Sequence, residues 1–238
     1  MKRLKEMKKS FLFAMSLLMA SSVNAGVIGV WGGSFNTWNS YITNTGNTAV
    51  SVNSGSDLSE LDQVWLIRQD GSANLIDYVN NGGTLVTEWS GAGWAVDTAS
   101  LLDATATSLG FVGTGTSITF TSEGTDLGLG TNTGNPYSNG VATQFFWSFT
   151  DLGSDVDVIA TITGFDVGIS GSYGNGNVLA LGWDWQDTSV DNAITQSLVD
   201  DIVGISYDSV SVPEPSSIAF LCLGLASLGF SRKTRKDT

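Results

Sequence analysis

The sequence predicts an α/β domain in which a mostly parallel sheet, flanked by helices, carries a β-rich antiparallel insertion. Two short apolar runs, residues 26–31 and 63–67, are typical of strands that are buried on both faces. A strand, a helix and a second strand follow one another between residues 63 and 89, which indicates a βαβ unit. From about residue 111 to residue 173, short alternating runs in a Gly-, Thr- and Ser-rich background favour antiparallel strands. An all-β sandwich is the alternative fold class.

The parallel strands are predicted in the first half of this domain. Their apolar runs are rich in Val, Ile, Leu and Trp, and glycine or polar residues bound each run. Ser72 is placed to cap a helix in which Leu75, Ile76 and Val79 form an apolar stripe, and residues 80–83 end it. We expect strands over residues 26–31, 49–52, 63–67 and 84–89, and a shorter helix over residues 35–42.

The second half is predicted to be mainly antiparallel before it returns to the α/β pattern. In residues 97–109 the spacing of Leu101, Leu102, Ala106 and Leu109 suits a helix. Segments rich in β-branched and aromatic residues follow, as strands require. The expected strands cover residues 117–121, 144–149, 156–162, 165–169 and 177–183, and the last helix covers residues 191–203.

The first 25 residues have the pattern of a secretory signal peptide. A basic segment precedes an apolar segment over residues 11–20, and small residues stand before a cleavage point between Ala25 and Gly26. The apolar segment is shorter than the ~20 residues that a spanning helix needs, so a retained anchor is not expected. The sequence therefore predicts a secreted protein whose mature chain begins at Gly26. The basic residues are Lys2, Arg3, Lys5, Lys8 and Lys9.

The last 26 residues combine three features in a fixed order. Pro213, Glu214 and Pro215 keep the chain extended, an apolar segment follows over residues 216–230, and a basic tail ends the chain. We expect the apolar segment to form a short transmembrane helix, with the tail on the cytoplasmic side. The basic residues of the tail are Arg232, Lys233, Arg235 and Lys236.

This C-terminal arrangement resembles the PEP-CTERM sorting signal of Gram-negative bacteria that make exopolysaccharide. The resemblance implies that an exosortase in the inner membrane recognises the Pro-Glu-Pro motif and cuts near it. An ordinary C-terminal membrane anchor is the alternative. The chain is thus divided into a signal peptide (residues 1–25), a secreted domain (residues 26–212) and a sorting signal (residues 213–238).

The secreted domain is strongly acidic. Of ten basic residues only Arg68 lies within residues 26–212, whereas 20 of the 23 acidic residues do, so the formal charge of this part is −19. Such a charge repels nucleic acid and anionic lipid, and we therefore expect neither as a partner.

Two residue types that carry much of enzyme chemistry are missing. The chain has no histidine, and its single cysteine, Cys222, lies in the C-terminal apolar segment. Without a thiolate or an imidazole base, the secreted domain has no Cys-His or Ser-His triad, and it lacks the usual zinc ligands. We expect no catalytic triad, no bound metal and no cofactor.

Three segments, residues 62–67, 75–86 and 178–185, resemble class I glutamine amidotransferase-like domains. In that family a helix ending in Gly-Gly leads into a strand, and the tight turn after the strand carries a catalytic cysteine. Here the equivalent turn contains Glu88, Trp89 and Ser90. The resemblance therefore implies an amidotransferase-like or flavodoxin-like fold without the catalytic residues of the family.

The candidate ligand site lies at the predicted carboxyl ends of the strands, where open α/β sheets bind their ligands. Aromatic residues there suit a sugar-binding surface, and carboxylates suit sugar hydroxyls or acid–base chemistry on a glycosidic bond. Core packing of the tryptophans and solvation of the acids are the structural alternatives. The candidate residues are Glu88, Trp89, Trp94, Trp183, Asp184 and Trp185.

The functional hypothesis is a non-catalytic protein that is exported, transiently anchored in the inner membrane and sorted by an exosortase. It is expected to reach the outer membrane, the cell surface or the extracellular matrix of a Gram-negative bacterium as a binding or structural component. The expected partners are signal peptidase and exosortase during processing, and exopolysaccharide or surface proteins afterwards. A carboxylate-based carbohydrate-active enzyme and a protein–protein adhesion module are the alternatives.

Overall fold

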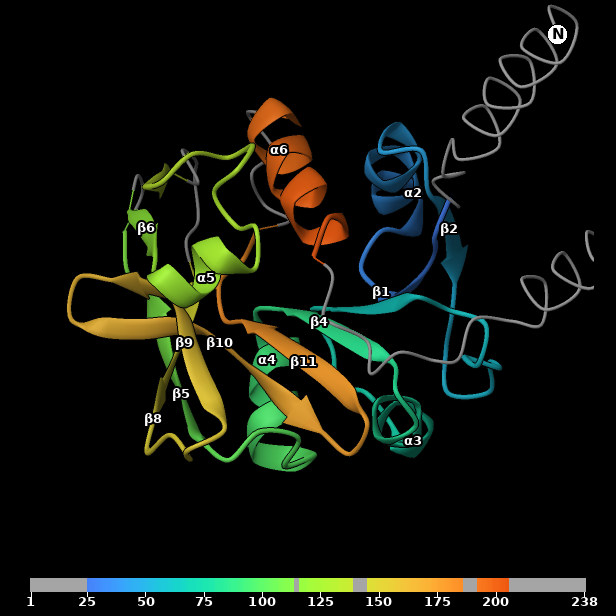
Figure 1. Cartoon of the computed structure of the whole chain (residues 1–238), viewed down its shortest axis with the longest axis horizontal. Coiled ribbons are helices and arrows are strands. Elements are labelled where there is room, and N and C mark those ends of the chain that lie inside the picture. The colour runs from blue at the N-terminus through green and yellow to red at the C-terminus, as the bar shows by residue number, and fades with distance from the viewer. Residues whose placement is uncertain (1–24, 114–115, 139–144, 186–191, 206–238) are drawn as a thin grey trace, which may run out of the picture. The chain divides into compact units, whose positions relative to one another are not determined.

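The computed structural model describes residues 25–113, 116–138, 145–185 and 192–205 (Figure 1). Its strands form one mixed sheet in the order β2-β1-β3-β4-β11-β10-β9-β6-β7, and β8 joins β5 to β10 beside this path. The fold class is therefore α/β, as predicted, and the all-β alternative is wrong.

The parallel half of the sheet is built from the predicted apolar runs. Pairs β1–β2, β1–β3, β3–β4 and β4–β11 are all parallel. The five residues of β3 are all buried, since helices cover both faces of this part of the sheet. The strands are β1 (Val27–Gly32), β2 (Thr48–Ser51), β3 (Gln63–Ile67), β4 (Thr84–Glu88) and β11 (Gly176–Leu181).

The antiparallel half continues the same sheet, because β11 pairs with β4 on one side and antiparallel with β10 on the other. The predicted insertion is thus confirmed as a β-rich section, although it begins at Thr105 and not near residue 111. Its strands are β5 (Thr105–Phe111), β6 (Ser117–Phe120), β7 (Tyr137–Ser138), β8 (Phe145–Thr150), β9 (Val156–Ile162) and β10 (Phe165–Tyr173).

Helices lie on both faces of the parallel strands (Figure 1). One face carries α2 and α6, which contact each other, and the other carries α3, α4 and the π-helical segment η1. A further short helix, α5, packs on β9. The helices are α2 (Phe35–Asn44), α3 (Ala73–Asn80), α4 (Ser90–Gly93), η1 (Trp94–Thr98), α5 (Ser122–Asp126) and α6 (Asn192–Val203).

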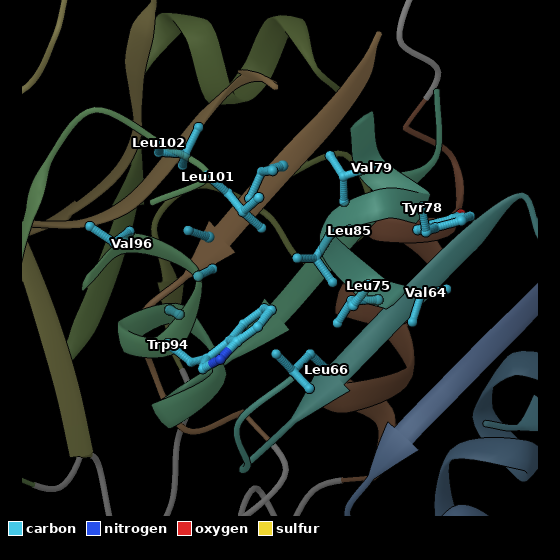
Figure 2. Packing of buried hydrophobic residues seen from close by; sticks show 14 of the residues in the cluster. Val64, Leu66, Leu75, Tyr78, Val79, Leu85, Trp94, Val96, Leu101 and Leu102 are labelled. Carbon is cyan, nitrogen blue, oxygen red and sulfur yellow. The ribbon is translucent and has the colours of Figure 1, made fainter. Parts of the chain in front are cut away.

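The core under α3 explains why its apolar stripe was visible in the sequence. Leu75 and Val79 of α3 are fully buried against Val64, Leu66 and Leu85 of the sheet (Figure 2). Burial of a leucine or valine side chain contributes about 1.5–3 kcal/mol, so this contact holds α3 on the sheet.

The opposite face of the sheet is packed with tryptophan. Trp38 of α2 lies 4.8 Å from the ring of Trp185 and 6.0 Å from that of Trp65, and Trp65 lies 5.7 Å from Trp185. All three rings are fully buried and meet edge-to-face, the arrangement that aromatic quadrupoles favour.

The predicted helix over residues 97–109 is wrong. Leu101, Leu102 and Ala106 are buried, but the π-helical segment ends at Thr98 and β5 begins at Thr105. Alternating Thr, Ala, Thr and Ser in β5 suit an extended strand, and pairing with β8 secures it. Ser72 stands at the N-cap of α3 but makes no capping hydrogen bond to the helix backbone; its hydroxyl donates to Asn74 Oδ1 instead.

The predicted signal peptide and the predicted transmembrane helix over residues 216–230 lie outside the described residues, apart from Ala25. Within the described ranges, the structure contains no helix of the length and apolarity that crossing a membrane requires.

Candidate functional site

The carboxyl ends of β3, β4 and β11 meet at one edge of the sheet, as the predicted site requires. The residues that follow β3, β4 and β11 there include Arg68, Trp89 and Asp184, and Glu88 is the last residue of β4. The structure therefore brings the two predicted carboxylates, Glu88 and Asp184, to the same place.

Arg68 links these two carboxylates. Its Nε donates to Glu88 Oε1 at 3.4 Å, and its Nη2 donates to Asp184 Oδ1. The carboxylate side chains are 0% and 2% exposed, whereas the Arg68 side chain is 24% exposed. Buried carboxylates need a compensating charge, and the one basic residue of the secreted domain supplies it. Arg68 was not among the predicted site residues.

Trp89 stands at a sharp strand-to-helix turn. Its φ of 47° and ψ of −108° lie in a region that a bulky residue adopts at a cost of about 1–3 kcal/mol. Its N–H is shared between the carbonyl oxygens of Leu181 (3.1 Å) and Trp183 (3.2 Å). Gly91 allows the turn to pass close to β3, since a Cβ there would lie 2.7 Å from the carbonyl oxygen of Leu66.

This turn has the geometry that some hydrolytic folds use to expose a nucleophile on a strained residue. Here an indole occupies the strained position, and Ser90 is the first residue of α4. The indole has no nucleophilic group. The turn therefore has the backbone geometry of a nucleophile turn but carries no nucleophile at the strained position.

The predicted tryptophan platform is not assembled. Trp183 and Trp185 are fully buried, and Trp94 is 6% exposed against Gly71. These three rings belong to the protein core, which was the structural alternative for them. Of the four candidate tryptophans only Trp89 is half-buried.

Two phenylalanines that were not among the predicted site residues extend from Trp89. The ring of Phe145 is 5.6 Å from that of Trp89, and Phe111 is 6.0 Å from Phe145. The Arg68 guanidinium lies 5.9 Å from the centre of the Trp89 ring. Phe111 is 54% exposed and Phe145 is half-buried. We call Trp89, Phe145 and Phe111 the aromatic strip.

Two cavities lie away from this edge. One, of about 460 Å³, is bordered by the loop before β3 and by α3, and its lining includes Asp57, Asp77 and Tyr78. The other, of about 540 Å³, lies between α2 and α6 and is lined by polar side chains and Ala193. Neither cavity is lined by a candidate site residue. In the part of the chain that the structure describes, no group of three or more acidic, His or Cys residues is placed to hold a metal ion.

Comparison with protein families identifies the C-terminus. Residues 211–236 match the model of the PEP-CTERM protein-sorting motif. The predicted sorting signal at Pro213, Glu214 and Pro215 is therefore confirmed, and it marks a secreted surface protein sorted by an exosortase. The sequences of curated proteins include no match to this chain.

Solved structures of similar fold cover about three quarters of the chain at low sequence identity. Agd3, a carbohydrate deacetylase, has a TM-score of 0.55 at 10% identity and covers 76% of this chain but 32% of its own. PurLQS from Thermotoga maritima has a TM-score of 0.53 at 11% identity, covering 76% and 97%. A glutamine amidotransferase has a TM-score of 0.48 at 15% identity, covering 76% and 100%. The likeness to these structures concerns the fold alone.

Proposed function

We propose that the secreted domain is a non-catalytic binding or structural component of the cell envelope or exopolysaccharide matrix. The observation that carries this proposal is the turn after β4, where Trp89 occupies the strained position at which related turns place a nucleophile. Signal peptidase cleaves after Ala25 in this proposal, and exosortase processing releases the domain from the inner membrane.

The carboxylates at the same edge support a non-catalytic role. A pair of acids that act on a glycosidic bond must reach the substrate from two sides. Glu88 and Asp184 are instead buried and both bind Arg68. This arrangement favours a structural role for the ion pairs over acid–base catalysis.

The test separates binding, catalysis and protein–protein adhesion. The processed protein is incubated with the exopolysaccharide of its host, and both co-sedimentation with the polymer and release of reducing ends are measured. We expect co-sedimentation without release of reducing ends. Release that is abolished by Glu88→Gln or Asp184→Asn would establish the carbohydrate-active enzyme instead. Sedimentation only with protein-containing envelope fractions would establish the adhesion module.

A further inference from the structure

We propose that the aromatic strip is a binding surface for a neutral polysaccharide. This inference rests on the proposed function and names its ligand class and its site. The strip runs from the carboxyl edge of the parallel strands, at Trp89, across β8 at Phe145 to β5 at Phe111. Its neighbouring ring centres are 5.6 Å and 6.0 Å apart and the ring planes are inclined by 46° and 61°, so the three rings form one contiguous apolar patch.

The strip is preorganised by backbone features from three elements. Phe111 and Phe145 are direct partners in the antiparallel β5–β8 register. A register shift between Ser108 and Gly110 precedes Phe111, and Gly110 has a φ of 66°, a conformation that favours glycine. Trp89 is held by its strained turn and by the Arg68 guanidinium near its ring. A surface whose rings are already ordered loses little conformational freedom on binding.

The chemistry of the strip selects its ligand. Aromatic faces carry a negative quadrupole, and the C–H groups on the face of a sugar ring present the complementary positive edge. A polymer can place successive sugar rings along a row of aromatic rings, as successive bases stack on aromatic side chains in single-strand binding proteins. The strip itself has no charged side chain.

Charge decides between neutral and anionic polymers. The secreted domain carries 20 acidic residues against Arg68 alone, and Arg68 is already committed to two buried carboxylates. An anionic polysaccharide would approach a strongly negative surface without a free cation to receive it. A neutral polysaccharide meets no such repulsion.

The experiment is affinity electrophoresis of the protein expressed with its own signal peptide and purified from the exported fraction. The formal charge of −19 on residues 26–212 makes it mobile in a native gel at neutral pH. The gels contain hydroxyethylcellulose, galactomannan or dextran as neutral probes and alginate as the anionic probe. Phe111→Ala is compared with Phe165→Ala, a matched control because Phe165 is 45% exposed on a different hairpin.

We expect at least one neutral probe to retard the protein, and alginate not to retard it. Phe111→Ala should weaken binding about five- to tenfold, the scale of one aromatic contact, whereas Phe165→Ala should bind like the parent. Phe111→Leu, which keeps apolar area but removes the ring, should also weaken binding. Urea unfolding of each variant verifies that it is folded.

Three results would overturn the inference: no retardation by any neutral probe, retardation by alginate alone, or equal binding by Phe111→Ala and Phe165→Ala. These results are distinct from failure of the proposed function. If Phe111→Ala still co-sediments with host exopolysaccharide as well as the parent does, the matrix role stands and the aromatic strip is not its site. If the parent itself does not co-sediment, the matrix role fails.

Discussion

Asp201 of α6 gives the sharpest test of how the antiparallel section is attached. Its side chain is 3% exposed, and its carboxylate accepts five hydrogen bonds from one loop. Oδ1 accepts from the N–H (2.7 Å) and Nδ2 (2.9 Å) of Asn132. Oδ2 accepts from Gly130 N (2.9 Å) and from the N–H (3.3 Å) and hydroxyl (2.7 Å) of Thr133. The carboxylate thus fastens the loop after α5 to α6.

Asp201→Asn replaces the carboxylate with an amide of nearly the same shape and so weakens the attachment of the loop to α6. An amide keeps one acceptor oxygen and turns an NH₂ group toward donors, so at least two hydrogen bonds to a charged group are lost. Each contributes about 1.5–3 kcal/mol, and the lower cost of burying a neutral amide offsets part of the loss. We expect unfolding free energy to fall by about 2–4 kcal/mol, and Tm by roughly 4–16 °C for a domain of this size.

Urea unfolding followed by tryptophan fluorescence measures this change, and hydrogen exchange locates it. The amides of Gly130, Asn132 and Thr133 should lose protection in Asp201→Asn. Asp200→Asn is the matched control. It makes the same charge change on the same helix, where the Asp200 carboxylate accepts a hydrogen bond from Gln196 Nε2 at 2.8 Å instead of holding a loop. Its effect should stay within about 0.5 kcal/mol. Equal stability of the two variants would refute the role of Asp201.

Three further predictions concern other parts of the fold. Burial raises the pKa of Tyr78 and Tyr137 above the ordinary tyrosine value of about 10. The stability that each protonated hydroxyl contributes is complete below a pH of about 10, and it is lost as the pH rises from there toward the folded-state pKa. Each Tyr→Phe change should reduce the fall in unfolding free energy that the parent shows as the pH rises above about 10. An unchanged slope of unfolding free energy against pH would contradict this. At neutral pH, Tyr78→Phe should cost about 1 kcal/mol because its hydroxyl bonds the backbone, while Tyr137→Phe should not, because that hydroxyl has no partner among the described residues. Arg68→Met should cost about 2–4 kcal/mol by leaving two buried carboxylates without their cation, and a parent-like urea midpoint would exclude this. N-terminal sequencing of the exported protein should begin at Gly26, whose N–H already donates to an amide oxygen at 2.6 Å; any other first residue would disprove the predicted cleavage.

The central strands of the parallel half, β1, β3, β4 and β11, were predictable because each contains an apolar run that suits a sheet covered on both faces. The segment over residues 97–109 was not, because Leu101, Leu102, Ala106 and Leu109 fit a helical stripe as well as the observed turn and strand. What decided the outcome was pairing of β5 with β8, a contact between segments about 40 residues apart. Local spacing carries no information about such a partner.

The position of the candidate site was predictable from the sequence, but the burial of its side chains was not. Parallel strands bring their carboxyl ends together, so the meeting of Glu88, Trp89 and Asp184 followed from strand assignment alone. Burial of Trp183 and Trp185 did not follow, because a tryptophan count does not say which rings face the core. Phe111 was missed because residues 105–109 of β5 were predicted to be helical, which left Phe111 at the start of the β-rich section without an assigned strand.

The strained turn at Trp89 contributes directly to the proposed binding surface. A φ of 47° persists only because the surrounding contacts fix it, and the side chain held there is a ring beside Phe145. Trp89→Gly should therefore relieve strain while it removes the ring. We expect a stability within about 1 kcal/mol of the parent, whereas Trp147→Gly, which removes a half-buried ring from within β8, should cost about 3 kcal/mol or more. Binding to the neutral probe should nevertheless be lost in Trp89→Gly. A large loss of unfolding free energy in Trp89→Gly would show that the turn is not strained. Retained binding by Trp89→Gly would show that the strained turn does not contribute to binding by the aromatic strip.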